Sequence, residues 1–205
     1  MLLSAYEQGI FPWYNPGDPL FWQSPDPRFV IFPEKLHVSS SMRKIFKRRL
    51  FAITFDKDFA GVINGCAEVY RPGQCETVQQ SCTVQQSCTW ISDDIIKAYT
   101  ELHRLGYAHS AEAWRDGALA GGCYGILMGR AFFGESMFAK ESNASKAAFL
   151  SLAEKLFGEG LLFIDCQVPT DHLASLGGKE MPRKDFLRLL KKCGALRSQL
   201  SISLK

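Results

Sequence analysis

The chain has 205 residues, of which 46% are hydrophobic and 22% are charged. These fractions are typical of a globular protein with a hydrophobic core, and the length suits one domain or one domain with a small appendage. The formal net charge of +3 is too small to indicate a nucleic-acid partner by itself, and no stretch is apolar enough to span a bilayer.

The cysteine content indicates a reducing compartment. The number of cysteines is odd, no Cys-x-x-Cys pair occurs, and the first residues lack the basic and apolar regions of a signal peptide. We therefore expect free thiols, a cytoplasmic protein and no metal site. The cysteines are Cys66, Cys75, Cys82, Cys88, Cys123, Cys166 and Cys193.

The first thirty residues combine prolines with aromatic side chains. Prolines as dense as those in residues 11–27 rule out a regular element, although so much aromatic surface should not face water. We expect a rigid loop that packs on the rest of the protein. A strand is predicted at 29–32, followed by a helix from about Ser41 with Ser39 or Ser40 as its cap.

This helix carries a dense run of cations. Residues 43–49 read Arg-Lys-Ile-Phe-Lys-Arg-Arg, which is five cations in seven positions. Such a run indicates either a surface for a polyanion or a solvated helix face. Taken alone, the run slightly favours the solvated face.

The middle of the chain contains a strand, two helices and an unusual repeat. Alternation predicts a strand at 51–55, and a helix follows at 57–69. Residues 77–88 read Thr-Val-Gln-Gln-Ser-Cys twice, which we interpret as an expansion of a surface loop. Ser92 then caps a helix that ends at Gly106. The buried face of that helix is predicted to comprise Ile95, Tyr99 and Leu102.

The second half of the chain predicts a layered α/β (α+β) domain. A meander of strands, followed by a helical crossover into a buried strand, is typical of this fold class. The predicted ranges are strands at 108–114, 118–128, 131–138 and 161–167, and helices at 143–157, 171–176 and 183–192.

This order of elements resembles the acyltransferase fold known as the GNAT fold. In that fold, a glycine-rich turn before the helix holds the pyrophosphate of acetyl-CoA. The corresponding turn here, residues 139–145, contains no glycine. The amino terminus of the following helix offers Ser142, Asn143 and Lys146, which suit a single phosphate.

One apolar strand ends in Asp165-Cys166-Gln167. Successive side chains alternate, so Asp165 and Gln167 should point one way and Cys166 the other. Asp165 either serves catalysis, or caps the next helix or pairs with a cation, and these readings stay open. A thiol nucleophile at Cys166 would need His109 or His172 beside it, so we favour a core position for this cysteine.

Two further features admit a functional and a structural reading. Glu135 interrupts an apolar strand, where its carboxylate suits a substrate ammonium or a backbone turn. Gly121 and Gly122 permit the close approach of a ligand or of another backbone, or they form a bulge.

Eight segments, taken in order over nearly the whole chain, resemble the leucyl/phenylalanyl-tRNA–protein transferase family. The resemblance implies an enzyme that moves Leu or Phe, and sometimes Met, from aminoacyl-tRNA onto proteins that begin with Arg or Lys. It also implies that the product is marked for degradation by the N-degron pathway. The segments are Gly-Ile-Phe-Pro-Trp at 9–13, Trp-Gln-Ser-Pro-Asp-Pro-Arg at 22–28, Thr-Trp-Ile at 89–91, His-Ser at 109–110, Gly-Glu-Ser-Met-Phe at 134–138, Asn-Ala-Ser-Lys at 143–146, Ile-Asp-Cys-Gln at 164–167 and His-Leu-Ala-Ser-Leu-Gly at 172–177.

The same resemblance implies the roles of individual residues. The catalytic residues would be Asp165, Gln167 and Glu135. The aminoacyl-adenosine would be bound by Trp13, Trp90, Ser136, Asn143 and Lys146. The tRNA would also contact the cationic helix through Arg43, Lys44, Lys47 and Arg48. The pocket for the aminoacyl side chain would comprise Phe132, Ile164, Cys123, Leu152 and Leu156.

The implied chemistry needs no cofactor. An aminoacyl ester is already activated, and an α-amine with a pKa of about 7.7–8.0 is partly neutral near pH 7. Holding the amine and the ester together contributes on the order of 7–11 kcal/mol. We expect the side-chain carbonyl of Gln167 to accept an amine N–H, and Asp165 to accept the side-chain amide N–H of Gln167.

The resemblance divides the chain into a remnant of a small amino-terminal subdomain at 1–26 and a GNAT-like domain at 27–205. The chain starts inside a helix of that subdomain, which is therefore expected to be shortened, and the repeat at 77–88 is expected to be an insertion before Trp90. We expect a monomer that binds aminoacyl-tRNA and acceptor proteins and no membrane. The alternatives are a small-molecule N-acyltransferase that uses acyl-CoA and a tRNA-binding module without catalysis.

Overall fold

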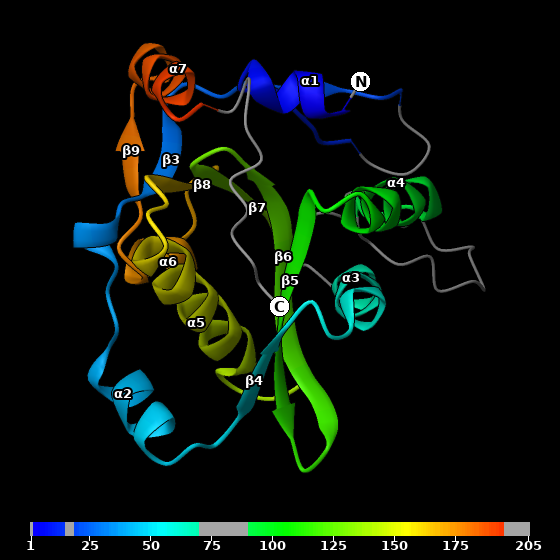
Figure 1. Cartoon of the computed structure of the whole chain (residues 1–205), viewed down its shortest axis with the longest axis vertical. Coiled ribbons are helices and arrows are strands. Elements are labelled where there is room, and N and C mark those ends of the chain that lie inside the picture. Colours follow the sequence, from blue (N-terminus) through cyan, green and yellow to red (C-terminus); the bar gives the residue numbers. More distant parts are fainter. Residues whose placement is uncertain (1, 15–18, 70–89, 195–205) are drawn as a thin grey trace, which may run out of the picture.

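The computed structural model describes residues 2–14, 19–69 and 90–194 (Figure 1), so the predicted repeat at 77–88 lies outside the described residues. The strands are β1 (Phe11–Pro12), β2 (Trp22–Gln23), β3 (Arg28–Ile31), β4 (Ala52–Phe55), β5 (Ala108–Arg115), β6 (Ala118–Met128), β7 (Ala131–Ala139), β8 (Phe163–Gln167) and β9 (Lys179–Met181). The helices are α1 (Leu2–Glu7), α2 (Ser40–Lys47), α3 (Phe59–Glu68), α4 (Asp93–Arg104), α5 (Ala144–Gly158), α6 (Asp171–Ser175) and α7 (Arg183–Lys192), with a 3-10 turn at Pro33–Lys35.

A seven-stranded sheet in the order β4-β5-β6-β7-β8-β3-β9 forms the centre of the fold, and β1 and β2 make a separate two-stranded sheet. Neighbouring strands of the large sheet are antiparallel except for β7 and β8, which are parallel. β3 lies between β8 and β9, although it precedes both by more than a hundred residues in the chain. The predicted α+β class is therefore confirmed.

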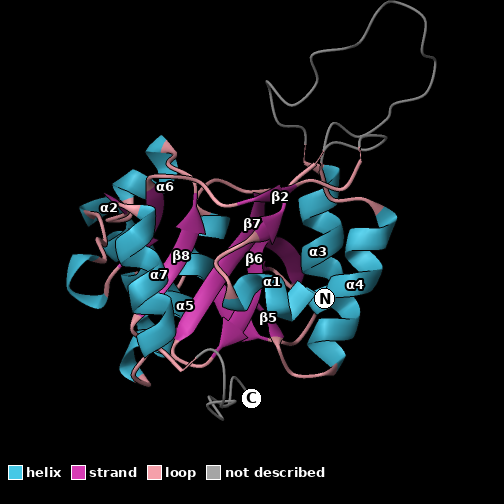
Figure 2. Cartoon of the chain, turned by 90° about the horizontal axis from the view of Figure 1, so that it is seen from above, coloured by secondary structure: helices cyan, strands magenta, loops and turns pink. Residues whose placement is uncertain are grey.

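Helices cover both faces of the sheet. α3 and α4 lie together on one side of the strands, and α5 with α2 lies on the other (Figure 2). Side chains alternate between two hydrophobic cores, so that Phe132 packs in the core under α5 and Phe133 in the core under α3 and α4. In the same way, Ile164 packs on the α5 side and Phe163 on the opposite side.

Most predicted elements are present, and local capping explains where several of them begin. The Ser39 hydroxyl accepts a hydrogen bond from the Met42 amide, and Ser92 caps α4 in the same way. α3 begins at Phe59 rather than at 57 because Asp58 is its cap. The predicted buried face of α4 is confirmed, with Tyr99 completely buried.

Three short strands were not predicted from the sequence. β1 and β2 pair within the proline-rich region, which was expected to be an irregular loop, and β9 pairs with β3. The expected packing of this region is confirmed for its described part, because Phe11 is buried and the Gly9 carbonyl accepts a hydrogen bond from Arg28. No helix among the described residues is long and apolar enough to cross a bilayer.

β7 and β8 pair over only three residues and then diverge. Their register ends at Phe133 opposite Asp165, while both strands continue. A register shift between β6 and β7 leaves Glu135 as an extra residue, and a shift between β3 and β8 leaves Cys166 as another. Such irregularities bend a strand and change the direction of its side chains, so they shape the region where the strands separate.

Gly121 allows close packing between β6 and the start of α5. A Cβ atom at this position would lie 2.7 Å from the Cβ of Ala144 and 2.9 Å from the carbonyl oxygen of Phe138. Gly122 is similarly close to the Ala111 carbonyl oxygen. The close approach of other protein segments is therefore confirmed, and a register shift that leaves Ala120 as an extra residue also places a bulge directly beside Gly121.

We predict that Gly121→Ala lowers the free energy of unfolding by about 1–3 kcal/mol, because the added methyl group meets a helix and a strand backbone. Gly158→Ala is the matched control, since a Cβ atom there meets nothing within 4 Å. The control should change stability by between zero and a gain of about 1 kcal/mol. Urea denaturation measures both, and equal stability of the two variants would contradict the described packing.

Candidate functional site

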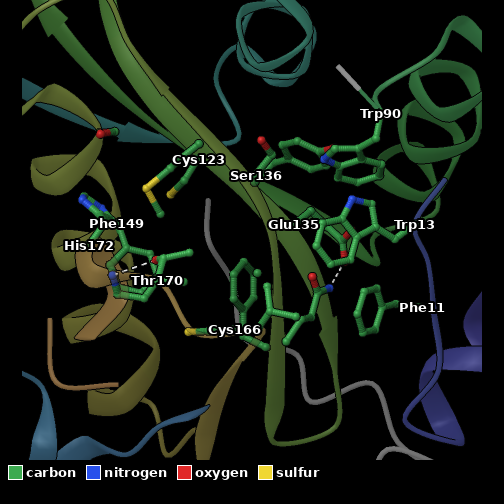
Figure 3. Close-up of a pocket in the computed structure, with 18 of the residues that line it drawn as sticks. Phe11, Trp13, Trp90, Cys123, Glu135, Ser136, Phe149, Cys166, Thr170 and His172 are labelled. Carbon is green, nitrogen blue, oxygen red and sulfur yellow. Dashed lines mark hydrogen bonds between the residues drawn. The ribbon is translucent and has the colours of Figure 1, made fainter. Parts of the chain in front are cut away.

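A cleft of about 500 Å³ opens where β7 and β8 part (Figure 3). It is bordered by residues 134–137 of β7, by the end of β8 and by the amino-terminal segment. The lining residues are Phe11, Pro12, Trp13, Trp90, Cys123, Tyr124, Phe132, Gly134, Glu135, Ser136, Met137, Ser145, Phe149, Cys166, Gln167, Val168, Thr170, His172 and Leu173.

The cleft has an aromatic end and an apolar end. Trp13 and Trp90 lie on one side, and Cys123, Phe149 and His172 lie on the opposite side (Figure 3). Trp13 is 37% exposed, so a flat ligand can reach its ring. The apolar end combines side chains from β6, β7, α5 and β8, of which Cys123, Phe132, Phe149 and Cys166 are buried.

Glu135 is the centre of a hydrogen-bond network beside Trp13. One carboxylate oxygen accepts from the Tyr6 hydroxyl at 2.7 Å, and the other accepts from the Tyr99 hydroxyl at 3.0 Å. The two tyrosine oxygens are 2.5 Å apart. Burial raises the pKa of Glu135 to about 7, although these hydrogen bonds favour its charged form. Burial and the neighbouring Glu135 also raise the pKa of both tyrosines, which therefore remain protonated donors.

Gln167 joins this network from the other strand. Its side-chain nitrogen donates to Glu135 at 3.2 Å, as the dashed line in Figure 3 marks. Since the nitrogen of this amide faces Glu135, the side-chain oxygen of Gln167, which has no hydrogen-bond partner among the described residues, can accept from a ligand. The network thus presents a hydrogen-bond acceptor and a carboxylate to the cleft.

Asp165 does not hold the Gln167 side chain, so that expectation is wrong. Its carboxylate instead accepts from Arg28, with 2.8 Å to Nε and 2.6 Å to Nη2, and from the backbone amide of Gln167 at 3.0 Å. Arg28 and Asp165 are both completely buried, and Asp165 is not among the described residues that line the cleft. Asp165 thus pairs with a cation, as one of its structural readings predicted, and a catalytic role for it stays a prediction.

Of the five residues predicted to form the pocket for the aminoacyl side chain, the structure places two in the cleft, and their role stays a prediction. Phe132 and Cys123 line the cleft. Ile164, Leu152 and Leu156 are completely buried in the α5-side core and do not line it. Several residues that line the cleft were not predicted from the sequence, and of these Met137, Phe149 and Leu173 enlarge the apolar end.

Three residues were predicted to bind the aminoacyl-adenosine together with the tryptophans, and only one of them lies in the cleft. Ser136 lines it, whereas Asn143 and Lys146 do not. The Asn143 side chain donates to the Ser142 hydroxyl at the start of α5. The pKa of His172 is lowered, chiefly by burial and also by the positive charge of Lys146.

The cations of α2 lie on an exposed surface. Arg43, Lys44, Lys47 and Arg48 are exposed, and none of them forms an ion pair with an acidic side chain among the described residues. Ile45, Phe46 and Met42 pack on the core instead. The charge of this face is therefore not neutralised within the described part of the protein.

The cysteines of the cleft are not arranged as nucleophiles. Burial raises the pKa of both Cys123 and Cys166, so their thiols stay protonated. No hydrogen bond joins Cys166 to a histidine among the described residues, and Nδ1 of His109 donates to the carboxylate of Asp56. Cys166 packs in the core as expected and also reaches the apolar end of the cleft.

Three residues of the site had weaker signals in the sequence. Tyr99 was placed on the buried face of its helix, where a phenol needs a polar partner. Arg28 follows a proline and begins an apolar strand, so its burial required a counter-charge. Tyr6 gave no distinctive pattern.

The described residues hold no group of three His, Cys, Asp or Glu side chains that could bind a metal ion.

Comparison with known proteins identifies one family. A sequence profile described as "Leucyl/phenylalanyl-tRNA protein transferase" matches residues 30–191, and the profile of its N-terminal domain matches residues 1–26. A leucyl/phenylalanyl-tRNA–protein transferase of Myxococcus xanthus is 50% identical over 189 residues, which are 92% of this chain and 76% of that protein. The enzyme of the same name from Syntrophus aciditrophicus is 49% identical over 191 residues, 93% of this chain and 75% of that protein.

The pKa of Glu135 predicts a specific pH dependence of stability. The folded protein holds this proton with a pKa of about 7, against 4.5 for the ordinary group. The folded state therefore binds more protons than the unfolded state between these values, and the contribution of Glu135 to stability is lost as the pH rises through 7. The effect is about 1.4 kcal/mol for each pKa unit.

The advantage in melting temperature of wild type over Glu135→Gln should thus decrease from pH 5 to pH 8. The exposed Glu154→Gln serves as the control and should follow the wild type at every pH. A difference between wild type and Glu135→Gln that is constant with pH would show that Glu135 does not titrate in this range.

Proposed function

The chain belongs to the leucyl/phenylalanyl-tRNA–protein transferase family, and on this basis we propose that it transfers an aminoacyl group from aminoacyl-tRNA to the amino terminus of a protein. One observation of the site carries the proposal. Two tryptophans, an apolar end and the Glu135–Gln167 pair meet in a single cleft. These are the parts needed to bind an adenosine, an apolar side chain and an attacking amine.

The donor would occupy both ends of the cleft. Trp13 and Trp90 offer ring faces to the terminal adenosine, and base stacking on an aromatic side chain typically contributes about 1–3 kcal/mol. The aminoacyl side chain would enter the apolar end beside Phe132 and Phe149. A cavity of this size and character suits Leu or Phe, and the flexible side chain of Met fits the same surface.

The acceptor would be a polypeptide that begins with Arg or Lys, so that its product becomes a substrate for N-degron degradation. Its α-amine would approach the side-chain oxygen of Gln167, which is the acceptor that Glu135 leaves free. The carboxylate of Glu135 lines the same part of the cleft and stabilises the positive charge that develops on the amine.

The transfer step exchanges one bond for another. A C–N bond forms between the α-nitrogen and the ester carbonyl carbon, and the C–O bond to the ribose breaks. The proton lost by the nitrogen ends on the ribose oxygen. Gln167 holds the amine by accepting one N–H and does not take the proton, because an amide oxygen is too weak a base. The ester is already activated, so the reaction needs positioning more than an added cofactor.

The remaining parts of the proposal concern partners and architecture. The uncompensated cations of α2 suit the phosphate backbone of tRNA. The separation of two parallel strands around the cleft supports a GNAT-like arrangement, with 1–26 as a small subdomain and 27–205 as the transferase domain. We further propose a cytoplasmic monomer.

The central test is the transfer of label from Leu-tRNA or Phe-tRNA to a polypeptide that begins with Arg. Labelled product that survives base hydrolysis of the ester is the expected result. Gln167→Ala should lower the single-turnover rate on the order of 10²–10³-fold, because the acceptor for the amine is lost. Binding of charged tRNA without any transfer by the wild type would instead indicate a binding module.

A second test concerns α2. Replacing Arg43, Lys44, Lys47 and Arg48 by Gln should weaken tRNA binding and reduce the slope of log affinity against log salt by about 0.7–0.9 for each lost phosphate contact. The exposed Lys184, Lys191 and Lys192 of α7, replaced by Gln, provide a control that removes positive charge elsewhere. Equal salt slopes for the two variants would place the tRNA on another surface.

A further inference from the structure

The carboxylate of Asp165 is fully occupied inside the protein. Oδ1 accepts from Nε of Arg28 and from the Gln167 amide, and Oδ2 accepts from Nη2 of Arg28. The side chain has no exposed surface and does not border the cleft. Both oxygens are therefore engaged by protein groups, and neither borders the cleft.

Each of the three nitrogens of the Arg28 guanidinium donates one hydrogen bond. Besides its two bonds to Asp165, it donates from Nη1 to the Gly9 carbonyl at 3.0 Å. Its guanidinium lies between the rings of Phe11 and Phe186, with centroid distances of 4.8 and 4.5 Å. This one side chain thus connects β3, β8, α7 and the amino-terminal segment, and the planar fork of arginine is needed for all of these contacts at once.

The pair is linked to Gln167 through the backbone. Gln167 adopts a left-handed conformation with φ of +66°, which is uncommon for a residue with a side chain. The hydrogen bond from its amide to Oδ1 of Asp165 stabilises this turn. This turn directs the Gln167 side chain towards Glu135 in the cleft. Arg28 is therefore connected, through Asp165 and the backbone of Gln167, to the side chain that would bind the amine.

We propose that Arg28 is a positioning residue for the transfer reaction, and that Asp165 acts with it through the geometry of Gln167 rather than through its negative charge. The inference rests on the proposed transfer function. Asp165 can act through geometry or through its charge. A single substitution cannot separate these two roles, because removing either partner leaves a buried charge uncompensated.

A double substitution distinguishes geometry from charge. Arg28→Gln with Asp165→Asn removes both charges, while the Gln nitrogen takes the place of Nε and the Asn oxygen still accepts the Gln167 amide. If geometry is sufficient, the double variant should transfer at least tenfold faster than Asp165→Asn alone. If the charge of Asp165 acts in the chemistry, the double variant should be no faster than Asp165→Asn.

Arg28→Lys gives an independent measurement with the charge of the pair retained. A lysine has one nitrogen and cannot bind both carboxylate oxygens and the Gly9 carbonyl together. The proposal predicts that kcat falls at least tenfold while KM for Phe-tRNA changes less than threefold. A wild-type kcat for Arg28→Lys would overturn it.

Both measurements use Phe-tRNA and a peptide that begins with Arg, with circular dichroism to establish that each variant is folded. If the double variant does not fold, the Arg28→Lys measurement alone tests the proposal. Absence of transfer by the wild type would refute the proposed function itself. An active wild type whose double variant is folded and no faster than Asp165→Asn would refute only the role of Arg28.

Discussion

The separation of β7 and β8 is the constraint on which the site depends. Two parallel strands that pair over three residues and then diverge leave a gap in the centre of the sheet, where protein interiors are otherwise closely packed. The gap lies in the plane of the sheet, between the two hydrophobic cores, so side chains of both cores can border it. An apolar end from the α5 side and a polar network from the other side can therefore border one cleft.

Irregularities in the strands determine which side chains enter this gap. Glu135 is an extra residue in β7, and Cys166 is an extra residue in β8. With strict alternation, every second side chain would stay on one face, and the carboxylate and amide would not be free to meet at the edge. The left-handed conformation of Gln167 completes this arrangement at the end of β8. Backbone geometry thus accounts for the contact between residues 32 positions apart.

Much of the fold could be predicted from the sequence because its signals are local. The caps at Ser39 and Ser92 and the alternation in the meander strands each depend on residues close together in the chain. The partners of Glu135 and Asp165 could not be predicted in this way, since Tyr6 is 129 positions from Glu135 and Arg28 is 137 positions from Asp165.

The errors at the site have the same cause. Alternation placed Asp165 and Gln167 on one face, which suggested a direct contact between their side chains. The carboxylate of Asp165 is instead paired with the buried Arg28. The family resemblance suggested Leu152 and Leu156 as pocket residues, but both are buried in the core, whereas Phe149 of the same helix lines the cleft. A motif match identifies an apolar helix face, but not which of its side chains meet a cavity.

The position of β3 also has a consequence for synthesis on the ribosome. This strand is made early and must wait for β8 and β9, which are synthesised more than a hundred residues later, before it has any neighbour in the sheet. The same delay applies to Tyr6, whose partner Glu135 is made 129 positions later, and to Phe11, which shares a hydrophobic core with Phe186. Contacts between such distant residues form slowly. A nascent chain therefore has no complete cleft until Leu173, the last of the described residues that line it, has been made, and Arg28 has no contact with Phe186 until α7 has followed.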